Sequence, residues 1–366
     1  MYIEKINLYN LLIPFKSPFK FAGGEYQNHS CLIVAIHSEG LTGWGECPTF
    51  EHPFYTYETI KTTYHVLTDF LIPSLLKKEI NSPQEFAQIS APVRGHNMAK
   101  SALDCALWDL FAQANNLSLQ EYIGGIRDKI SVGVAVSLEK DLEKLLTKVN
   151  NYVDEGYQRI KVKISKDWAL QPLEKIRKNY PDLMIMADAN SVFSLEDLAL
   201  FKQLDQLNLL MIEQPLGYDD LLEHSYLQSQ IKTPICLDES INSVNDTRNA
   251  IKLKSCQIVN LKPSRVGGVT NTLKIHQICQ QTGIKLWCGG MLESGIGRAL
   301  NLHISSLENF QLPADISATN RYFHEDITTT NLYLNQEDST INIPKQRKGI
   351  GVEINPEMLI KYSNDK

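Results

Sequence analysis

Short apolar runs and helix-spaced apolar positions alternate along most of the chain. After Gly124 and Gly125, eight short apolar runs occur, each followed by a longer stretch with apolar positions at helical spacing. This alternation is typical of an α/β fold with a parallel sheet, in which every strand is followed by a helix. The predicted strands are residues 132–137, 159–164, 183–188, 209–213, 235–238, 257–262, 285–289 and 313–316.

The polar residues that close five of these runs recur at a nearly constant interval. Lys163, Asp188, Glu213, Asp238 and Lys262 are separated by 25, 25, 25 and 24 residues. An open doubly wound sheet could share this interval, but no Gly-rich phosphate-binding pattern follows the first strand. Eight similar units therefore favour a closed (β/α)8 barrel.

The segments on either side of the barrel have different patterns. Strand-like runs at residues 3–13 and 31–37, with a further run ending at Glu46, indicate an antiparallel meander, and helical spacing follows up to residue 116. We therefore predict an α+β domain over residues 1–125 and the barrel over residues 126–320. The strand-like, turn-rich segment 321–366 is expected to return to the first domain.

Composition excludes several classes of partner. The net charge is −6 and the basic residues are scattered, which argues against binding of nucleic acid. No apolar stretch approaches the roughly 18 residues of a membrane helix, and Glu4 and Lys5 lie where a signal peptide would be apolar. We therefore expect a cytoplasmic protein with no membrane partner.

Cysteine and histidine usage indicates no disulfide framework and no zinc site. The seven cysteines form no CxxC pair, so we expect them to be free and buried. The nine histidines are dispersed, with none at helical metal-binding spacing, which favours surface or packing roles.

Two lysines alternate with apolar residues in the predicted strand 159–164. Alternation places Arg159, Lys161 and Lys163 on the barrel interior, where cations need anionic partners. An exposed edge strand is the alternative for a single Lys-x-Lys pattern. The next three strands end in Asp188, Glu213 and Asp238, which supply the required anions.

The three carboxylates also predict a metal site. The ends of neighbouring strands lie about 4.8 Å apart, so these oxygens can converge on one hard cation. An all-oxygen donor set suits Mg2+, or Mn2+, and not zinc. Each acidic residue taken alone could instead cap the following helix, but three in register at the active face of a barrel favour the metal.

The sixth strand brings a second lysine to the same rim. Lys262 ends a strand four positions from that of Lys163, so the two lysines are expected on opposite faces of a substrate. Removal of a proton next to a carboxylate needs such a base together with electrostatic stabilisation by a divalent cation. Cationic neighbours can lower the pKa of a lysine, and we expect Lys161, Arg159 and the metal to do so for Lys163, and Arg265 for Lys262.

These motifs resemble the enolase superfamily, in particular its muconate-cycloisomerase-like subgroup. Within that subgroup, two segments are similar to the o-succinylbenzoate synthase and N-succinylamino acid racemase branch. They are Lys262-Pro263-Ser264-Arg265-Val266-Gly267-Gly268 and the segment from Trp287 to Arg298, and shorter matches occur at residues 43–46 and 53–55.

The resemblance implies a modified TIM barrel capped by the first domain, with Mg2+ on Asp188, Glu213 and Asp238 and with Lys163 and Lys262 as acid and base. A synthase of this branch dehydrates a cyclohexadiene carboxylate to 2-succinylbenzoate in menaquinone biosynthesis. A racemase activity on N-succinylamino acids is the alternative, and a barrel that only binds a ligand is a third. The substrate is thus a small carboxylate, and a homo-oligomer is possible in this fold. Residues expected to bind substrate or support the site are Lys161, Asn190, Asn260, Arg265, Gly289, Gly290 and Met291.

Two further expectations concern substrate choice. Ala135 stands where relatives in the branch usually have serine, so a hydroxyl facing the substrate is missing. By resemblance, two loops close over the barrel mouth and tune specificity; they carry Phe19, Gly23, Gly24, Phe50, His52, Phe54 and Tyr55.

Overall fold

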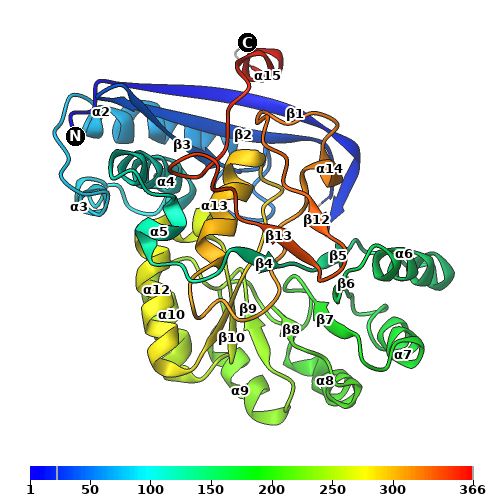
Figure 1. Ribbon diagram of the computed structural model, residues 1–366. Coiled ribbons are helices and arrows are strands. Elements are labelled where there is room, and N and C mark those ends of the chain that lie inside the picture. The colour runs from blue at the N-terminus through cyan, green and yellow to red at the C-terminus, as the bar shows by residue number, and fades with distance from the viewer. Residues whose placement is uncertain (22–23, 365–366) are drawn as a thin grey trace.

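The computed structural model describes residues 1–21 and 24–364. It divides into an N-terminal part built on an antiparallel sheet and a larger part built on a parallel sheet (Figure 1). The first sheet has the order β1-β2-β3, with strands Lys5–Phe21, Gly24–Ser38 and Leu41–Cys47. The predicted meander is confirmed.

Five α-helices and one π-helix (η1, Leu67–Leu71) follow this sheet, and the longest α-helix packs directly on β3. The glycines of β3 allow close contact, since a Cβ atom at Gly43 would lie 2.1 Å from the Ala106 carbonyl oxygen, and one at Gly45 would lie 2.0 Å from that of Ala102. Small residues on the helix complete the fit. The helices are α1 (Ile60–Val66), α2 (Ile72–Leu75), α3 (Glu85–Ile89), α4 (Asn97–Ala114) and α5 (Leu119–Ile123).

The parallel sheet contains seven strands in sequence order, from β5 to β11. Lys163 pairs in register with Asp188, and Asp188 with Glu213, so the regular interval in the sequence corresponds to aligned strand ends. The strands are β5 (Val134–Val136), β6 (Arg159–Lys163), β7 (Met184–Asp188), β8 (Ile212–Glu213), β9 (Ile235–Leu237), β10 (Ile258–Leu261) and β11 (Lys285–Cys288).

The predicted eighth strand, 313–316, is not a regular strand but still closes the ring. The Gly133 N–H donates to the Ala314 carbonyl at 2.8 Å, and the Asp315 N–H donates to that of Cys288 at 2.9 Å. The segment is therefore hydrogen-bonded to both ends of the seven-stranded sheet. This closure confirms the barrel class.

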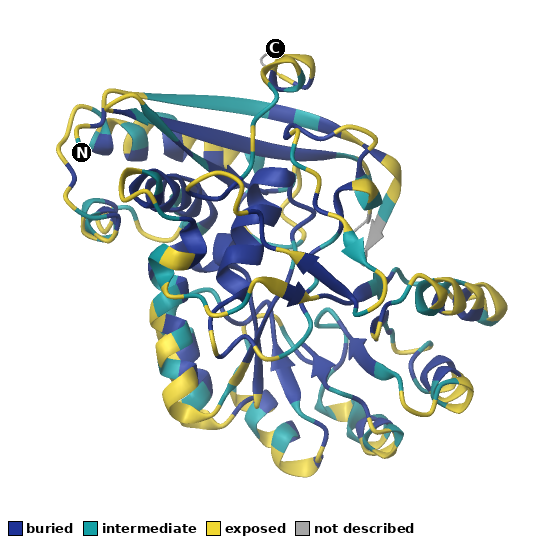
Figure 2. Cartoon of the chain, in the orientation of Figure 1, coloured by how far each residue is buried: buried dark blue, intermediate teal, exposed yellow. Residues whose placement is uncertain are grey.

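Most helices of the barrel lie outside the strands, with their buried faces toward the strands and their exposed faces outward (Figure 2). In α11 (Pro263–Val266) and α13 (Gly295–Ser305), by contrast, every residue is buried. Inside, Met186, Met211, Cys236, Ile258 and Trp287 form a separate buried cluster. The helices are α6 (Leu142–Asp154), α7 (Leu170–Asn179), α8 (Leu198–Leu204), α9 (Leu222–Gln230), α10 (Val244–Leu253), α11 (Pro263–Val266), α12 (Val269–Thr282) and α13 (Gly295–Ser305).

The C-terminal segment contacts both parts of the molecule. The strand β13 (Thr340–Asn342) pairs with β12 (Leu334–Asn335) and with β4 (Lys129–Ser131) beside the barrel. Further on, the Leu12 N–H of β1 donates to the Tyr362 carbonyl at 2.9 Å, next to α15 (Pro356–Lys361). These contacts support the proposed return of residues 321–366 to the first domain, with α14 (Thr319–Tyr322) facing the barrel mouth.

All seven cysteines are free and buried, as predicted. In the described part of the chain, no helix combines the length and the apolar character needed to cross a bilayer.

Candidate active site

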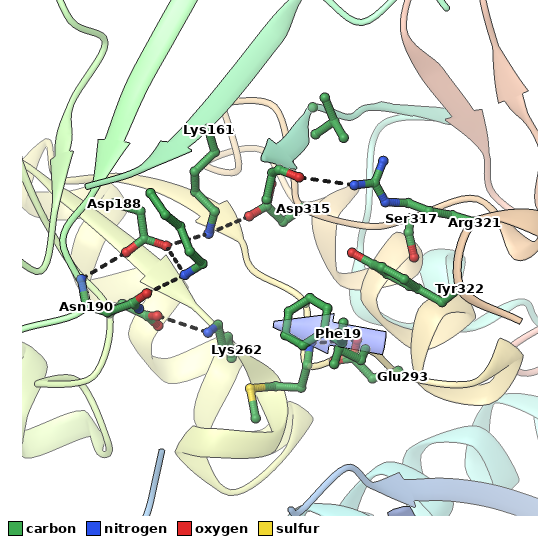
Figure 3. Close-up of a pocket in the computed structure, with 18 of the residues that line it drawn as sticks. Phe19, Lys161, Asp188, Asn190, Lys262, Glu293, Asp315, Ser317, Arg321 and Tyr322 are labelled. Atoms are coloured by element: carbon green, nitrogen blue, oxygen red, sulfur yellow. Dashed lines mark hydrogen bonds and ion pairs between the residues drawn. The ribbon is translucent and has the colours of Figure 1, made fainter. Parts of the chain in front are cut away.

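One pocket lies where the strand ends of the barrel meet the N-terminal domain (Figure 3). Eight of the predicted site residues line it, and four lie just behind them. Those in the lining are Lys161, Lys163, Asp188, Asn190, Asp238, Lys262, Gly290 and Met291. Those behind it are Glu213, Asn260, Arg265 and Gly289.

The two lysines of β6 reach different partners. The Lys163 ammonium lies 3.0 Å from an Asp188 carboxylate oxygen and donates to the Asn190 side-chain oxygen. The Lys161 ammonium lies 3.2 Å from oxygens of both Asp188 and Glu213 and 2.7 Å from Asp315. An exposed edge strand is thereby excluded, since Lys161 is buried among three carboxylates.

The three predicted metal-binding carboxylates are all buried at the ends of β7, β8 and β9. The chain turns sharply after the first two, with positive φ at Asn190 (41°) and Gln214 (37°), so that these carboxylates stay at the rim. Burial, and then the neighbouring Asp188, raise the pKa of Glu213 to about 8. A divalent cation would remove this cost of gathering like charges, and the all-oxygen donor set suits Mg2+ or Mn2+.

Lys262 and Arg265 share one carboxylate. The Lys262 ammonium lies 2.9 Å from Asp238, and the Arg265 guanidinium donates to the other oxygen of the same group. Burial is the largest single influence and lowers the pKa of Lys262, but Asp238 and Tyr55 both raise it, and the net result is a pKa well above its usual range. Arg265 does lower the pKa as expected, yet the net direction is opposite to the prediction, because the nearer charge is negative.

The supporting residues hold these groups in place. The Asn260 amide donates to Glu213 at 2.6 Å, and the Asn190 amide donates to Glu239 at 3.0 Å. A Cβ atom at Gly289 would lie 2.2 Å from the Asn260 side-chain oxygen and 2.7 Å from Lys262 Cε. Glycine is therefore required there for Lys262 to lie against β11.

Several pocket residues were not identified from the sequence as parts of the site, among them Asp315, Arg321 and Tyr322. Asp315 pairs with Lys161 and with Arg159, at 2.6 Å from the latter. Asp315 lies at the end of the eighth strand segment, so a search for acidic residues at strand ends, which identified the other carboxylates, could have identified it too. Arg321 and Tyr322 lie on the short helix α14, which has no sequence signal of its own.

The residues of the two predicted loops lie in different places. Phe19, Phe50 and Tyr55 line the pocket, whereas His52 and Phe54 line a separate depression beside Tyr26. Gly23 lies outside the described residues, and only the backbone of Gly24 is described, as the start of β2. Ala135 also lines the pocket, in the position where a serine is usual in the branch.

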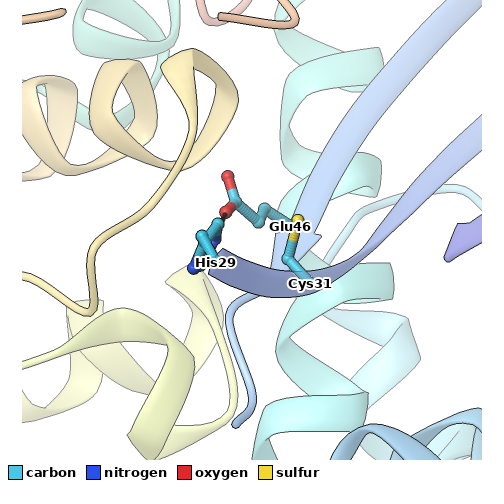
Figure 4. Close-up of side chains that lie close together, drawn as sticks. All are labelled: His29, Cys31 and Glu46. Carbon is cyan, nitrogen blue, oxygen red and sulfur yellow. Dashed lines mark hydrogen bonds and ion pairs between the residues drawn. The ribbon is translucent and has the colours of Figure 1, made fainter. Parts of the chain in front are cut away.

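A second cluster of ligand-type side chains lies outside the pocket (Figure 4). Within residues 1–21 and 24–364, His29, Cys31 and Glu46 form the only group of three whose ligand atoms all lie within 4.8 Å of one another. The strand-end carboxylates are spaced more widely, with Lys161 between two of them. The Glu46 carboxylate already accepts hydrogen bonds from Ser294 and Gly297, and burial raises the pKa of Cys31 well above its usual range. The cluster therefore joins the two domains and does not suit a metal.

Known protein families and curated relatives match nearly the whole chain. The family described as Enolase C-terminal domain-like matches residues 144–358, and the N-terminal domain of mandelate racemase / muconate lactonizing enzymes matches residues 5–124. An o-succinylbenzoate synthase of Bacillus subtilis (strain 168) is 47% identical over 361 residues, covering 98% of this chain and 96% of the relative. An N-succinylamino acid racemase of Thermus thermophilus is 40% identical over 325 residues, covering 89% of this chain and 88% of the relative.

Solved structures show the same fold. The crystal structure of an enolase superfamily member from Listeria innocua matches with a TM-score of 0.97 at 42% identity, covering 100% of this chain and 98% of that chain. A dipeptide epimerase from Cytophaga hutchinsonii, crystallised with Mg and the dipeptide D-Ala-L-Val, matches with a TM-score of 0.91 at 26% identity, covering 99% of this chain and 98% of that chain.

Proposed function

Because the chain belongs to the mandelate racemase / muconate lactonizing enzyme family of the enolase superfamily, we propose that it acts as an o-succinylbenzoate synthase. It dehydrates 2-succinyl-6-hydroxy-2,4-cyclohexadiene-1-carboxylate to 2-succinylbenzoate, a lyase reaction of menaquinone biosynthesis. One observation carries the proposal. Lys163 on β6 and Lys262, directly after β10, line the same pocket, beside Asp188 and Asp238 respectively.

We assign Mg2+ to Asp188, Glu213 and Asp238. The support is their burial and their position on three adjacent strands. Burial, and after it Asp188, also raise the pKa of Glu213. When bound, the ion stabilises the negative charge that develops on the substrate carboxylate. Lys161 and Asn260 hold Glu213 from either side.

In the proposed mechanism, Lys163 removes the proton on the carbon that bears the ring carboxylate. The electron pair left behind forms the new ring double bond as the C–O bond to the hydroxyl breaks. Lys163 then returns its proton to the departing oxygen, so that water leaves and the ring becomes aromatic. Lys262 remains cationic on the other face, where Asp238 keeps its pKa high, and stabilises the developing charge.

Racemisation of N-succinylamino acids is a second candidate activity. The observation that favours it is again the pair of lysines, since racemisation needs one lysine to remove the α-proton and a protonated lysine on the other face to return one. The racemase of Thermus thermophilus is also a near relative. Both reactions begin with the same proton removal.

Two assays on the wild-type enzyme with Mg2+ test the proposal. The first follows consumption of the cyclohexadiene substrate, and the second follows deuterium incorporation at the α-carbon of N-succinylamino acids in D2O. Rapid dehydration supports the synthase, and exchange without dehydration would replace it by the racemase. An enzyme silent in both assays would contradict the proposal.

A further inference from the structure

Arg321 stands at the side of the pocket away from Asp188 and Asn190 (Figure 3). It comes from α14, and its Nη2 atom donates to the Ala135 carbonyl oxygen at 3.1 Å. Its guanidinium carbon lies 5.1 Å from the ring centroid of Tyr152 and 5.3 Å from that of Tyr322. The same Nη2 atom also donates to the Tyr152 hydroxyl at 3.5 Å. Two hydrogen bonds and two aromatic faces therefore fix the direction of this cation.

The charge environment of Arg321 differs from that of every other cation at the pocket. Each of the others has a carboxylate oxygen within 4 Å: Lys161, Lys163, Lys262, Arg159 and Arg265 pair with Asp188, Glu213, Asp238 or Asp315. Among the described residues, none supplies such a partner to Arg321. A half-buried cation left without an anion favours the binding of one.

The position of Arg321 matches the shape of the proposed substrate. Ala135, to which it is bound, pairs in register with Lys161 of β6, so the guanidinium is anchored one strand from the lysine pair. The proposed substrate carries two carboxylates, one on the ring beside the reacting carbon and one at the end of the succinyl chain. The strand-end carboxylates and their metal take the first, which leaves the second without an assigned partner.

We propose that Arg321 binds the terminal carboxylate of the succinyl group and so makes the pocket selective for succinylated substrates. This inference rests on the proposed function, because that function supplies the second carboxylate. Arginine suits the role because its planar fork of N–H donors matches the two oxygens of a carboxylate. N-succinylamino acids carry the same terminal group, so the assignment holds for both candidate reactions.

Calorimetric binding of two probes in the presence of Mg2+ tests the assignment. One is 2-succinylbenzoate, and the other is 2-butyrylbenzoate, in which a methyl group replaces the terminal carboxylate. The proteins are the wild type, Arg321→Gln, Arg321→Lys and the control Arg248→Gln, which removes an exposed arginine of α10. We expect Arg321→Gln to weaken the binding of 2-succinylbenzoate by about tenfold or more and to change the binding of 2-butyrylbenzoate by less than about twofold.

Arg321→Lys keeps the charge but loses the planar set of N–H donors. It should therefore weaken the binding of 2-succinylbenzoate less than Arg321→Gln does, and still more than it weakens the binding of 2-butyrylbenzoate. This variant also decides the matter if Arg321→Gln does not fold. Equal weakening of the binding of both probes would mean that Arg321 only holds α14 against β5. Unchanged binding of both probes would also overturn the assignment. If the wild type dehydrates the cyclohexadiene but the Arg321 variants bind the two probes with unchanged selectivity, this inference alone is refuted. If the wild type shows no turnover, the proposed function is refuted.

Discussion

The Tyr55 hydroxyl oxygen lies 2.7 Å from the Lys262 ammonium nitrogen, although the two residues are 207 positions apart. The same hydroxyl lies 2.9 Å from Arg265. Tyr55 belongs to the N-terminal domain, whereas Lys262 follows a barrel strand. One hydrogen bond thus connects the loop that carries Tyr55 to a lysine that we propose as catalytic.

Removal of that hydroxyl is expected to disturb the position of Lys262. Tyr55→Phe keeps the ring over the lysine but leaves the ammonium short of one acceptor, and we expect kcat for dehydration to fall about tenfold with little change in KM. Steady-state kinetics measures both. Tyr57→Phe, the same change at an exposed tyrosine of the same segment, serves as the control. A fall in both variants alike would show that the loop, and not this hydrogen bond, matters.

Mg2+ is expected to stabilise the fold as well as to activate the enzyme. Three buried carboxylates repel one another, so a cation bound to the folded state alone raises the melting temperature as its concentration rises. Glu213→Gln should abolish this rise, whereas the exposed control Glu223→Gln should keep it. Calorimetric melting with and without Mg2+ gives the answer. A rise that persists in Glu213→Gln would place the ion elsewhere.

Glu46 is expected to hold the two domains together. Its carboxylate, from β3, accepts the Ser294 and Gly297 N–H groups at the start of α13 and also contacts His29 at 3.0 Å. Glu46→Gln places an amide where these donors converge, and we expect the free energy of unfolding to fall by about 2 kcal/mol. Urea denaturation measures the loss. An unchanged midpoint would mean that these hydrogen bonds are replaced by others at no cost.

His303 is expected to make the protein sensitive to acid. Its Nδ1 accepts the Gln120 N–H at 3.0 Å and its Nε2 lies 3.1 Å from the Ile350 carbonyl oxygen, an arrangement that needs the neutral ring. Burial lowers the pKa of His303 to about 4. The unfolded chain therefore binds a proton at higher pH than the folded one, and stability is lost as the pH falls from about 6.5 toward 4, by up to about 3 kcal/mol.

The free energy of unfolding of the wild type and of His303→Gln, measured at about pH 7.5 and about pH 4.5, tests this dependence. The variant is expected to be less stable at the higher pH, but to lose less of its stability on acidification. An equal loss in both proteins would assign the acid sensitivity to other groups.

The sequence was sufficient for the parts of the site that follow strand periodicity. Lys163, Asp188 and Glu213 could be found because strands of equal spacing end at one rim, and their register in the sheet follows the same regularity. Asp315 obeys that rule too, at the end of a segment that lacks regular strand geometry.

Contacts made by loops and by the second domain could not be predicted in this way. Arg321 reaches the pocket from a single helical turn, and Tyr55 reaches Lys262 across the domain boundary. The predicted direction of the shift in the pKa of Lys262 was also wrong. The sequence showed the nearby Arg265, but it did not show that Asp238 lies between the two cations. Distances, and not residue types, decide which charge dominates.

The dehydration rate of Lys163→Ala, measured with saturating Mg2+ beside the wild type and the exposed control Lys166→Ala, tests most directly whether Lys163 removes the proton. Lys166 lies three positions further along the chain and, among the described residues, forms an ion pair with Asp197 alone. We predict that Lys163→Ala loses about 10²-fold to 10⁴-fold in kcat while the control keeps its rate. A Lys163→Ala enzyme within a few-fold of the wild type would contradict the assignment of Lys163 as the base.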